Sequence, residues 1–183
     1  GLGDVYKRQA LNTTEYLTVG SASEPLEVAL SSQAEWCTAV VEGARMRIRA
    51  STNLGAERSV TLHVTAGRFT QDVVLVQRAF DPVRNYGDGE VVALQRATSG
   101  NGVCLVVVGD GYTLAEMARG TGKYETDMRR AAEAFFSVYP YSAYRSYFDV
   151  YMLTAISEEA GMSCVSPSET VDTKFSTLWQ GVS

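Results

Sequence analysis

Residues 103 to 157 constrain the fold of this chain more than any other part of it. The apolar run VCLVVV at 103–108 leads into the turn GDGYT, and an amphipathic segment reaching Phe136 leads into a second apolar run, YFDVYMLTAI, at 147–156. Strands that carry apolar residues on both faces are typical of sheets covered on both sides. A buried strand, a helical crossover and a second buried strand predict a parallel, right-handed β-α-β unit.

The crossover predicts two helices. Thr113 and Glu116 have the spacing of a capping box, so a first helix is expected directly after Tyr112. A second helix is expected to end at Pro140, because the apolar residues before it recur at steps of three and four and form a stripe on one face. These residues are Tyr124, Met128, Ala131, Phe135 and Val138.

Short strand-like runs separated by turn residues fill residues 10–79, and none of them has a helical period. In the run RSVTLHVTAG, apolar residues at 60, 62 and 64 alternate with polar ones, which predicts one buried and one solvated face. Gly67 supplies a hairpin turn before the next run. This half therefore predicts an all-β, immunoglobulin-like sandwich of antiparallel strands.

Composition changes divide the chain further. Residues 80–89 carry one proline and two glycines and predict a linker, after which residues 90–183 predict an incomplete α/β domain built on the β-α-β unit. Residues 1–9, GLGDVYKRQ, are similar to the translation of a sequencing-library adaptor. We therefore expect these nine residues to lie outside the fold.

The charge of the chain argues against a nucleic-acid partner. The net charge is −5 over 183 residues, whereas phosphate binding needs clustered lysine and arginine. In the most basic stretch, Arg45, Arg47 and Arg49 alternate with apolar residues and share one strand face. The sequence leaves two interpretations of this arginine face: a solvated sheet surface, or a contact with an acidic glycan. No apolar run in this sequence approaches the ~20 residues of a membrane span.

The cysteines do not form a recognisable framework. Cys37, Cys104 and Cys164 are odd in number and widely spaced, which excludes a zinc knuckle and a set of paired disulfides. Cys37 and Cys104 occur in apolar strands and are expected to be buried thiols. A bridge between Cys104 and Cys164 is open if the protein is exported, since its geometry decides the matter.

Histidine usage bears on metal chemistry. A catalytic zinc takes three protein ligands and one water, and peptidases often supply two of the ligands from an HExxH helix. This sequence has one histidine, His63, and no HExxH segment. We therefore expect no metal ligands and no catalytic residues in this chain, and we expect it to end before the chemistry of any zinc enzyme begins. His63 itself is expected to be a solvated strand residue.

The turn after the first apolar strand is the best candidate for a binding site. Ligands of open α/β sheets bind beyond the carboxyl ends of the strands, where Asp110, Gly111 and Tyr112 lie. The glycines let a backbone approach a ligand closely, and Asp110 has the chemistry to bind substrate or to support a metal ligand. The alternative is that Asp110 and Gly111 only turn the chain into the capped helix.

Trp36 and a cluster of five aromatic residues are further candidates for contacts with a sugar or a peptide. Trp36 could stack on a sugar ring as a glycan contact, although a tryptophan that fills the core of the sandwich is an equally physical interpretation. Tyr139, Tyr141, Tyr144, Tyr147 and Phe148 could form a shelf for a peptide or sugar. We expect core packing for Trp36 and for this aromatic cluster, because both offer a large area to bury.

Particular residues of the first half resemble a BACON domain. The similarity rests on Trp36 at the start of a strand, on Asn53 before the strand that begins at Arg58, and on the terminal VVLVQ at 73–77. BACON domains are immunoglobulin-like modules of secreted glycan-degrading and peptidase proteins of gut bacteria. The resemblance implies an accessory module.

The second half resembles the amino-terminal part of peptidase M64, a zinc family that includes immunoglobulin A peptidases. The similarity rests on the ordered combination of GDGYT, an acidic helix residue at Asp127, the segment FFSVYPYSAYRSYFDVY, the strand end at 157–161 and DTKF at 172–175. The zinc ligands and general base of that family have no counterpart here.

Together the resemblances imply a fragment of an exported zinc endopeptidase with an accessory sandwich. The parent protein would use zinc to cut a protein or glycoprotein substrate, and this fragment is expected to be inactive and to bind no zinc. A secreted or cell-surface location is implied. One alternative is a non-catalytic surface protein that binds glycan or mucin through the sandwich, and another is a purely structural spacer.

Overall fold

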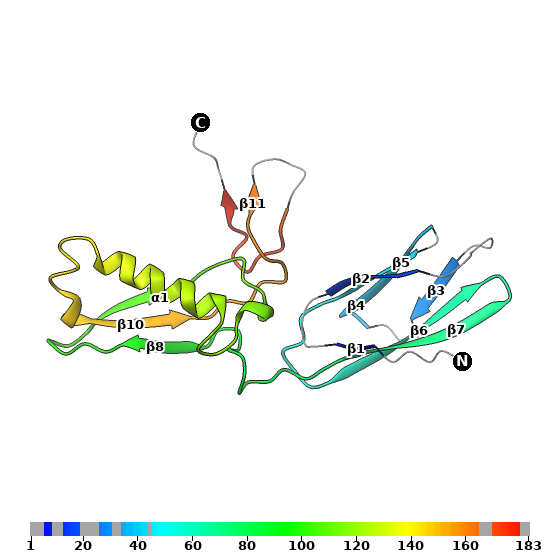
Figure 1. Cartoon of the computed structure of the whole chain (residues 1–183), viewed down its shortest axis with the longest axis horizontal. Coiled ribbons are helices and arrows are strands. Elements are labelled where there is room, and N and C mark those ends of the chain that lie inside the picture. Colours follow the sequence, from blue (N-terminus) through cyan, green and yellow to red (C-terminus); the bar gives the residue numbers. More distant parts are fainter. Residues whose placement is uncertain are drawn as a thin grey trace. The chain divides into compact units, whose positions relative to one another are not determined.

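The computed structural model describes residues 6–8, 13–18, 26–30, 34–43, 45–164 and 170–179. The chain forms two units, Gly1–Phe80 and Asp81–Ser183. The described residues of the first unit contain strands without helices, whereas those of the second add the α-helix α1 (Figure 1). In the described residues we find no helix with the length and apolar character that crossing a membrane requires.

The first unit is a pair of sheets. One sheet has the strand order β1-β7-β6-β3 and the other β2-β5-β4, and all neighbours are antiparallel except β1 and β7. The strands are β1 (Tyr6–Arg8), β2 (Thr13–Thr18), β3 (Leu26–Leu30), β4 (Cys37–Glu42), β5 (Arg45–Ala50), β6 (Arg58–Ala66) and β7 (Phe69–Gln77). The sequence places Tyr6–Arg8 outside the fold, but in the structure these three residues pair with β7. The adaptor origin of residues 1–9 stays a prediction.

Strand alternation builds the core between the two sheets. Six residues from four strands of the two sheets are almost fully buried, and they form one cluster: Cys37, Met46, Ile48, Val60, Leu62 and Leu75. The intervening Arg45 and Arg49 are exposed, as the period of two predicts. Gly67 makes the β6–β7 turn with a φ of 57°, which confirms the predicted hairpin and sandwich.

A three-stranded sheet with the order β8-β10-β9 forms the centre of the second unit. The strand β8 (Val91–Gln95) runs antiparallel to β10 (Phe148–Leu153), and β9 (Val103–Val107) runs parallel to β10. The helix α1 (Lys123–Phe136) connects β9 to β10 and packs on one face of the sheet through Phe136 and Ala132. The parallel β-α-β arrangement is thus confirmed. Four shorter elements complete the unit: η1 (Leu114–Glu116), η2 (Arg145–Tyr147), β11 (Ser163–Cys164) and β12 (Leu178–Trp179).

The helices differ from the prediction in their length and in the side of α1 that is buried. The capping box of Thr113 and Glu116 is present, but it opens only the 3-10 turn η1. The predicted stripe is wrong at Ala131 and Val138, which are exposed, whereas Phe135 packs against the core cluster as predicted, although it is only partly buried. The apolar residues that are fully buried along α1 follow an unbroken step of four, at Tyr124, Met128, Ala132 and Phe136. The α-helix ends at Phe136, so Val138 lies beyond it and is exposed.

The predicted burial of β9 on both faces is also wrong for the described residues. Leu105 and Val107 face α1, whereas Val103, Val106 and Val108 have exposed fractions of 54%, 50% and 45%. Cys104 and Val106 point away from α1, because strand neighbours face opposite sides, and the Cys104 thiol is exposed.

The aromatic cluster after α1 is split. Phe148 packs into the core under α1 as expected. The four tyrosines do not, because the segment after α1 lies at the surface: Tyr139, Tyr141, Tyr144 and Tyr147 are all exposed.

Residues 81–89, which were expected to be linker, belong to the second unit. Tyr86 is buried and its hydroxyl donates to Glu125 of α1 at 2.7 Å. Its backbone nitrogen donates to the Met117 carbonyl at 2.9 Å, and Asn85 forms a bridge with Ala118. These bonds fix the segment against the start of α1.

Candidate functional site

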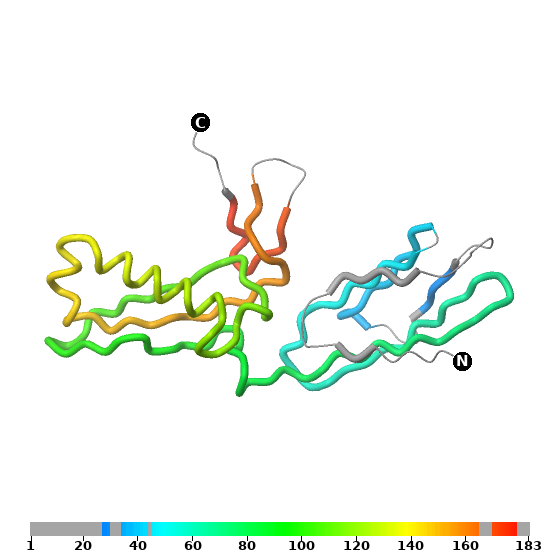
Figure 2. The backbone as a smooth tube through the Cα atoms, viewed as in Figure 1, coloured from blue at the N-terminus to red at the C-terminus, as the bar shows by residue number. Residues whose placement is uncertain are grey.

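The loops at the carboxyl ends of β9 and β10 form the candidate site. Because the two strands are parallel, the turn at 109–112 and the segment at 154–161 leave the sheet at the same edge. A third segment, 172–177, joins them through hydrogen bonds from Phe175 and Thr177 to Asp110. The orange and red parts of the backbone in Figure 2 follow β10 into this region.

Asp110 is the centre of the site. Three donors meet its Oδ1 at 2.9 to 3.2 Å, and three meet its Oδ2 at 2.5 to 3.1 Å. They are the backbone nitrogens of Gly111, Phe175 and Thr177 and the hydroxyls of Ser157, Thr173 and Thr177. One carboxylate therefore joins all three segments.

The hydrogen bonds keep Asp110 ionised. Burial alone would raise the pKa of this carboxyl, but the hydroxyls of Thr177 and Thr173 and the backbone N–H groups of Thr177 and Phe175 outweigh it. The pKa of Asp110 consequently lies well below its usual range. With six donors around two oxygens, the lone pairs of the carboxylate are occupied by the protein itself.

Ser157 is the second member of the network. It is buried, and its hydroxyl donates to Asp110 at 3.2 Å while accepting from the backbone nitrogens of Gly111 at 3.1 Å and Lys174 at 3.0 Å. Its own nitrogen donates to the Tyr112 carbonyl at 2.7 Å. The sequence pattern gave Ser157 no role, although the segments around it carried part of the family resemblance.

A side chain at position 111 would strain this turn. Its φ is +73°, and a Cβ atom at this position would collide with the Gly161 carbonyl group. The two glycines instead approach closely, and the Gly161 nitrogen donates to the Gly111 carbonyl at 2.9 Å. The close approach that the sequence suggests toward a ligand is made here toward another part of the chain, and an approach to a ligand stays a prediction.

Tyr112 points toward α1. Its hydroxyl donates to Asp127 at 2.9 Å, Lys123 lies 4.5 Å from its ring centre, and its ring meets that of Tyr124 edge to face at 4.9 Å. Burial, followed by the carboxylate of Asp127, raises the pKa of Tyr112, so the phenol stays neutral. Asp127, which the family resemblance had picked out, thereby links the turn to the helix.

A second attachment lies beside the first. Lys174 reaches Asp88 with its ammonium group at 2.6 Å, and the other oxygen of Asp88 accepts from the Ile156 nitrogen at 2.9 Å. Asp88 therefore holds the segment 172–177 to the end of β10 through a second carboxylate. The polar groups of the site therefore bond mainly to one another and hold the three loop segments together.

The residues present do not fit a catalytic zinc. Within the described ranges, no group of three or more His, Cys, Asp or Glu could hold a metal ion. His63 lies in the first unit, where its Nδ1 is 2.5 Å from Asp72, and the cysteines at 37, 104 and 164 are free thiols. No chemical step through zinc can be derived from these side chains.

Trp36 lies in the first unit, directly before β4. It is half-buried and packs against the core cluster, and the Arg58 guanidinium covers its ring at 4.6 Å from the centre. This placement agrees with a packing role. A glycan contact by Trp36 stays a prediction, as does substrate binding by Asp110, Gly111 and Tyr112.

The Asp110 network lies within a part of the chain that matches a known family. Residues 92–181 match the model of the family described as IgA Peptidase M64. The match includes Asp110, Ser157, Thr173 and Thr177, and thus every residue that bonds to the central carboxylate. A search of curated proteins finds no match.

Similar solved structures include an NMR structure of a Bacteroides thetaiotaomicron protein, with 19% identity and a TM-score of 0.37 over 44% of this chain and 80% of that one. A Bacteroides ovatus GH5 xyloglucanase has 19% identity and a TM-score of 0.36 over 42% of this chain. An endo-fucoidan hydrolase of glycoside hydrolase family 107 has 18% identity and a TM-score of 0.39 over 62% of this chain. This chain covers 17% of the length of each hydrolase.

Proposed function

We propose that this chain is part of an exported zinc endopeptidase of the M64 type, with the sandwich as an accessory module. The family match over residues 92–181 carries the proposal. It is supported by the Asp110 network, because the bonded segments are the ones whose sequences resemble that family. The substrate would be a protein or glycoprotein.

The proposal places the zinc ligands outside these 183 residues, since the sequence holds one histidine. In the parent enzyme, zinc would activate a water molecule for attack on a peptide carbonyl. Asp110 would then act as a positioning residue: its carboxylate holds the loops at the carboxyl ends of β9 and β10, where ligands of such sheets bind.

Expression of the parent gene product tests the proposal. The full protein should cleave casein or immunoglobulin A, lose activity with 1,10-phenanthroline and regain it with added zinc. The 183-residue chain should do neither and should bind no zinc stoichiometrically. Chelator-sensitive cleavage by the 183-residue chain itself would refute the assignment of zinc to other residues.

Asp110→Asn in the full protein tests the positioning role. We expect kcat to fall about tenfold or more while zinc content stays unchanged, because a misplaced loop costs catalysis without touching the metal. Asp172→Asn is the matched control, since the exposed Asp172 lies in the same segment but does not bond to the network through its carboxylate in the described structure. Equal activity of both variants would remove Asp110 from the proposal.

A glycan or mucin contact by the sandwich is the second hypothesis. No contact in the described structure favours it, because Arg58 covers one face of the Trp36 ring. Binding to a glycan array that disappears in Trp36→Ala, with the fold retained, would establish it.

A further inference from the structure

The two lateral edges of the β8-β10-β9 sheet, along β8 and along β9, differ in their chemistry. Charged residues flank β8, with Glu90 before it and Arg96 after it, and its pairing with β10 shifts register between Val150 and Tyr151. Natural sheets use charges and register irregularities to keep a free edge from pairing with another strand. The strand β8 is therefore built as a true edge of the sheet.

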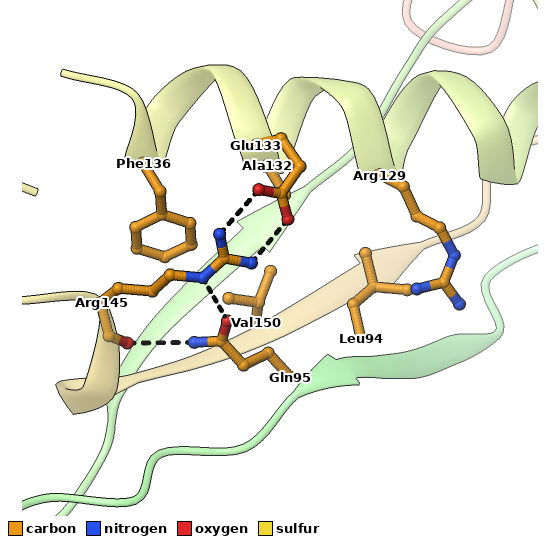
Figure 3. Close-up of a pocket in the computed structure, with 8 residues that line it drawn as sticks. All are labelled: Leu94, Gln95, Arg129, Ala132, Glu133, Phe136, Arg145 and Val150. Carbon is orange, nitrogen blue, oxygen red and sulfur yellow. Dashed lines mark hydrogen bonds and ion pairs between the residues drawn. The ribbon is translucent and has the colours of Figure 1, made fainter. Parts of the chain in front are cut away.

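Side chains close the end of β8 as well. Gln95, the last residue of β8, donates from Nε2 to the Arg145 carbonyl at 3.0 Å and accepts from Nε of Arg145 at 2.8 Å (Figure 3). Arg145 is paired in turn with Glu133 of α1 at 2.5 Å. The polar side chains at this end of β8 are thus bonded within the second unit.

The opposite edge, formed by β9, has none of these devices. Its sequence VCLVV contains no charge and no proline, and its register with β10 is unbroken. Within the described residues, no strand pairs with the outer side of β9. An edge strand presents a row of unpaired N–H and C=O groups, and an uncharged apolar edge is a template for a further strand.

The burial of β9 is also incomplete. None of its residues is fully buried, whereas Val150 and Met152 of the neighbouring strand β10 have exposed fractions of 1% and 0%. Cys104 and Val106, on the face away from α1, are exposed. Parallel pairing and apolar residues on both faces are typical of strands inside a covered sheet. The strand β9 therefore has the sequence of an interior strand at the position of an edge strand.

The Asp110 network indicates where a partner strand can come from. Phe175 and Thr177 bond to Asp110, which follows shortly after the end of β9, so the polypeptide returns at this point to the carboxyl end of β9. A strand that follows the segment 172–177 would need only a short connection to reach β9.

We propose that a further β-strand, supplied by the part of the parent enzyme outside these 183 residues, pairs along the outer edge of β9. The inference rests on the proposed function, which places part of the enzyme outside this chain. The residues of the added strand that lie opposite β9 should be uncharged and apolar, because β9 offers no charge for a cross-strand pair.

Hydrogen exchange of the β9 amides, measured by mass spectrometry in the 183-residue chain and in the full parent protein, tests the inference. The amides that point to the outer edge have no partner strand in the isolated chain and should exchange fast there. In the parent protein they should exchange at least about 100-fold more slowly, because the added strand accepts their hydrogen bonds. Exchange that is equally fast in both proteins would overturn the inference.

Val106→Lys and Val91→Lys form a matched pair, since both valines are exposed in this chain, by 50% and 62%, and lie on β9 and β8. In the parent protein, Val106→Lys should speed exchange of the β9 amides at least about tenfold, whereas Val91→Lys at the free edge should leave it unchanged. Equal effects would contradict the inference. Circular dichroism checks the fold, and the wild-type comparison decides alone if Val106→Lys does not fold.

Other occupants of the β9 edge give different results. Protection that is already present in the 183-residue chain and rises with its concentration would assign the edge to a second copy and overturn the inference. Protection of the parent protein that appears only when casein is added would assign the edge to substrate, with the same consequence. Zinc-dependent cleavage without slower β9 exchange refutes this inference alone, and slower exchange without cleavage refutes the proposed function alone.

Discussion

Thr177 donates two hydrogen bonds to the same oxygen of Asp110, one from its hydroxyl at 2.5 Å and one from its backbone nitrogen at 3.1 Å, across a sequence separation of 67 residues. The turn after β9 and the segment before β12 are thus joined through one carboxylate. The order of the whole edge depends on that group being charged and correctly placed.

Asp110→Asn should loosen this edge. An asparagine can keep one oxygen toward Gly111 and Phe175, but its amide group then faces the Thr177 nitrogen, which can only donate. Loss of hydrogen bonds to a charged group costs about 2 kcal/mol, so exchange of the Thr177 amide should rise about 30-fold, and more than that of Phe175. Hydrogen exchange measured by NMR checks both amides.

Asp172→Asn is the control for that experiment, because Asp172 is exposed and contributes backbone groups to the same segment. Its effect on stability should stay within about 0.5 kcal/mol. If both variants change the exchange of Thr177 equally, the carboxylate of Asp110 does not hold the segment.

The stabilisation by Asp110 should depend on pH in one direction. Because its pKa is lowered in the folded state, the stabilisation is complete above the unfolded-state pKa of about 3.9 and is lost as the pH falls toward the folded-state pKa. Protection of the Thr177 amide, corrected for intrinsic exchange, should be constant from about pH 7 to 5 and should decrease below about pH 4. Asp110→Asn should remove that decrease, while other acids continue to titrate. A decrease that persists in the variant would assign it to another group.

Gly111→Ala and Gly120→Ala form a matched pair. Both glycines have a positive φ, +73° and +75°, so an alanine at either position pays for a left-handed backbone, about 1–2 kcal/mol. At Gly120 the added Cβ meets nothing within 4 Å, whereas at Gly111 it collides with the Gly161 carbonyl. Gly111→Ala should therefore be the more destabilising by at least about 2 kcal/mol in urea unfolding. Equal losses would mean that the two loops separate without cost.

The sequence was sufficient for features set by local pattern. Alternation placed Leu62 inside and Arg45 outside, and the apolar runs predicted the parallel pairing of β9 with β10. The turn chemistry of Gly111 also followed from its position. Each of these depends on neighbours within a few residues or on the period of a strand.

Long-range contacts could not be predicted in this way. Asp110 was identified as a candidate, but its partners Thr173 and Thr177 are more than sixty positions away, and polar side chains in a loop carry no periodic signal. The side of α1 that faces the core was predicted only in part, for a related reason. Apolar residues of α1 can be chosen at alternating steps of three and four or at an unbroken step of four, and both choices fit the sequence about equally well. Packing against Val150 selects Ala132 and Phe136.

Tyr124 and Tyr112 should differ in their response to removal of the hydroxyl. Tyr124 is fully buried, and its hydroxyl donates to the Leu153 carbonyl at 2.5 Å and accepts from the Gly109 nitrogen at 3.1 Å. Tyr124→Phe removes the hydroxyl partner of two part-buried backbone groups and should cost about 2–4 kcal/mol. In Tyr112→Phe, the lost partner Asp127 keeps its bond to Lys123, so we expect about 1 kcal/mol. Thermal unfolding of the two variants checks the order, which a larger effect of Tyr112→Phe would contradict.

The three thiols should differ in reactivity, which tests whether one face of the β8-β10-β9 sheet is open. Burial raises the pKa of the Cys37 thiol and shields it, while Cys104 on the face away from α1 and Cys164 in β11 are exposed. Because thiol reagents need an accessible sulfur, Ellman's reagent should label two thiols in the native protein and the third only after unfolding. Cys104→Ser should remove one of the two fast thiols, and Cys37→Ser should leave both. If Cys104 is protected in the native chain, another part of the protein covers this sheet face.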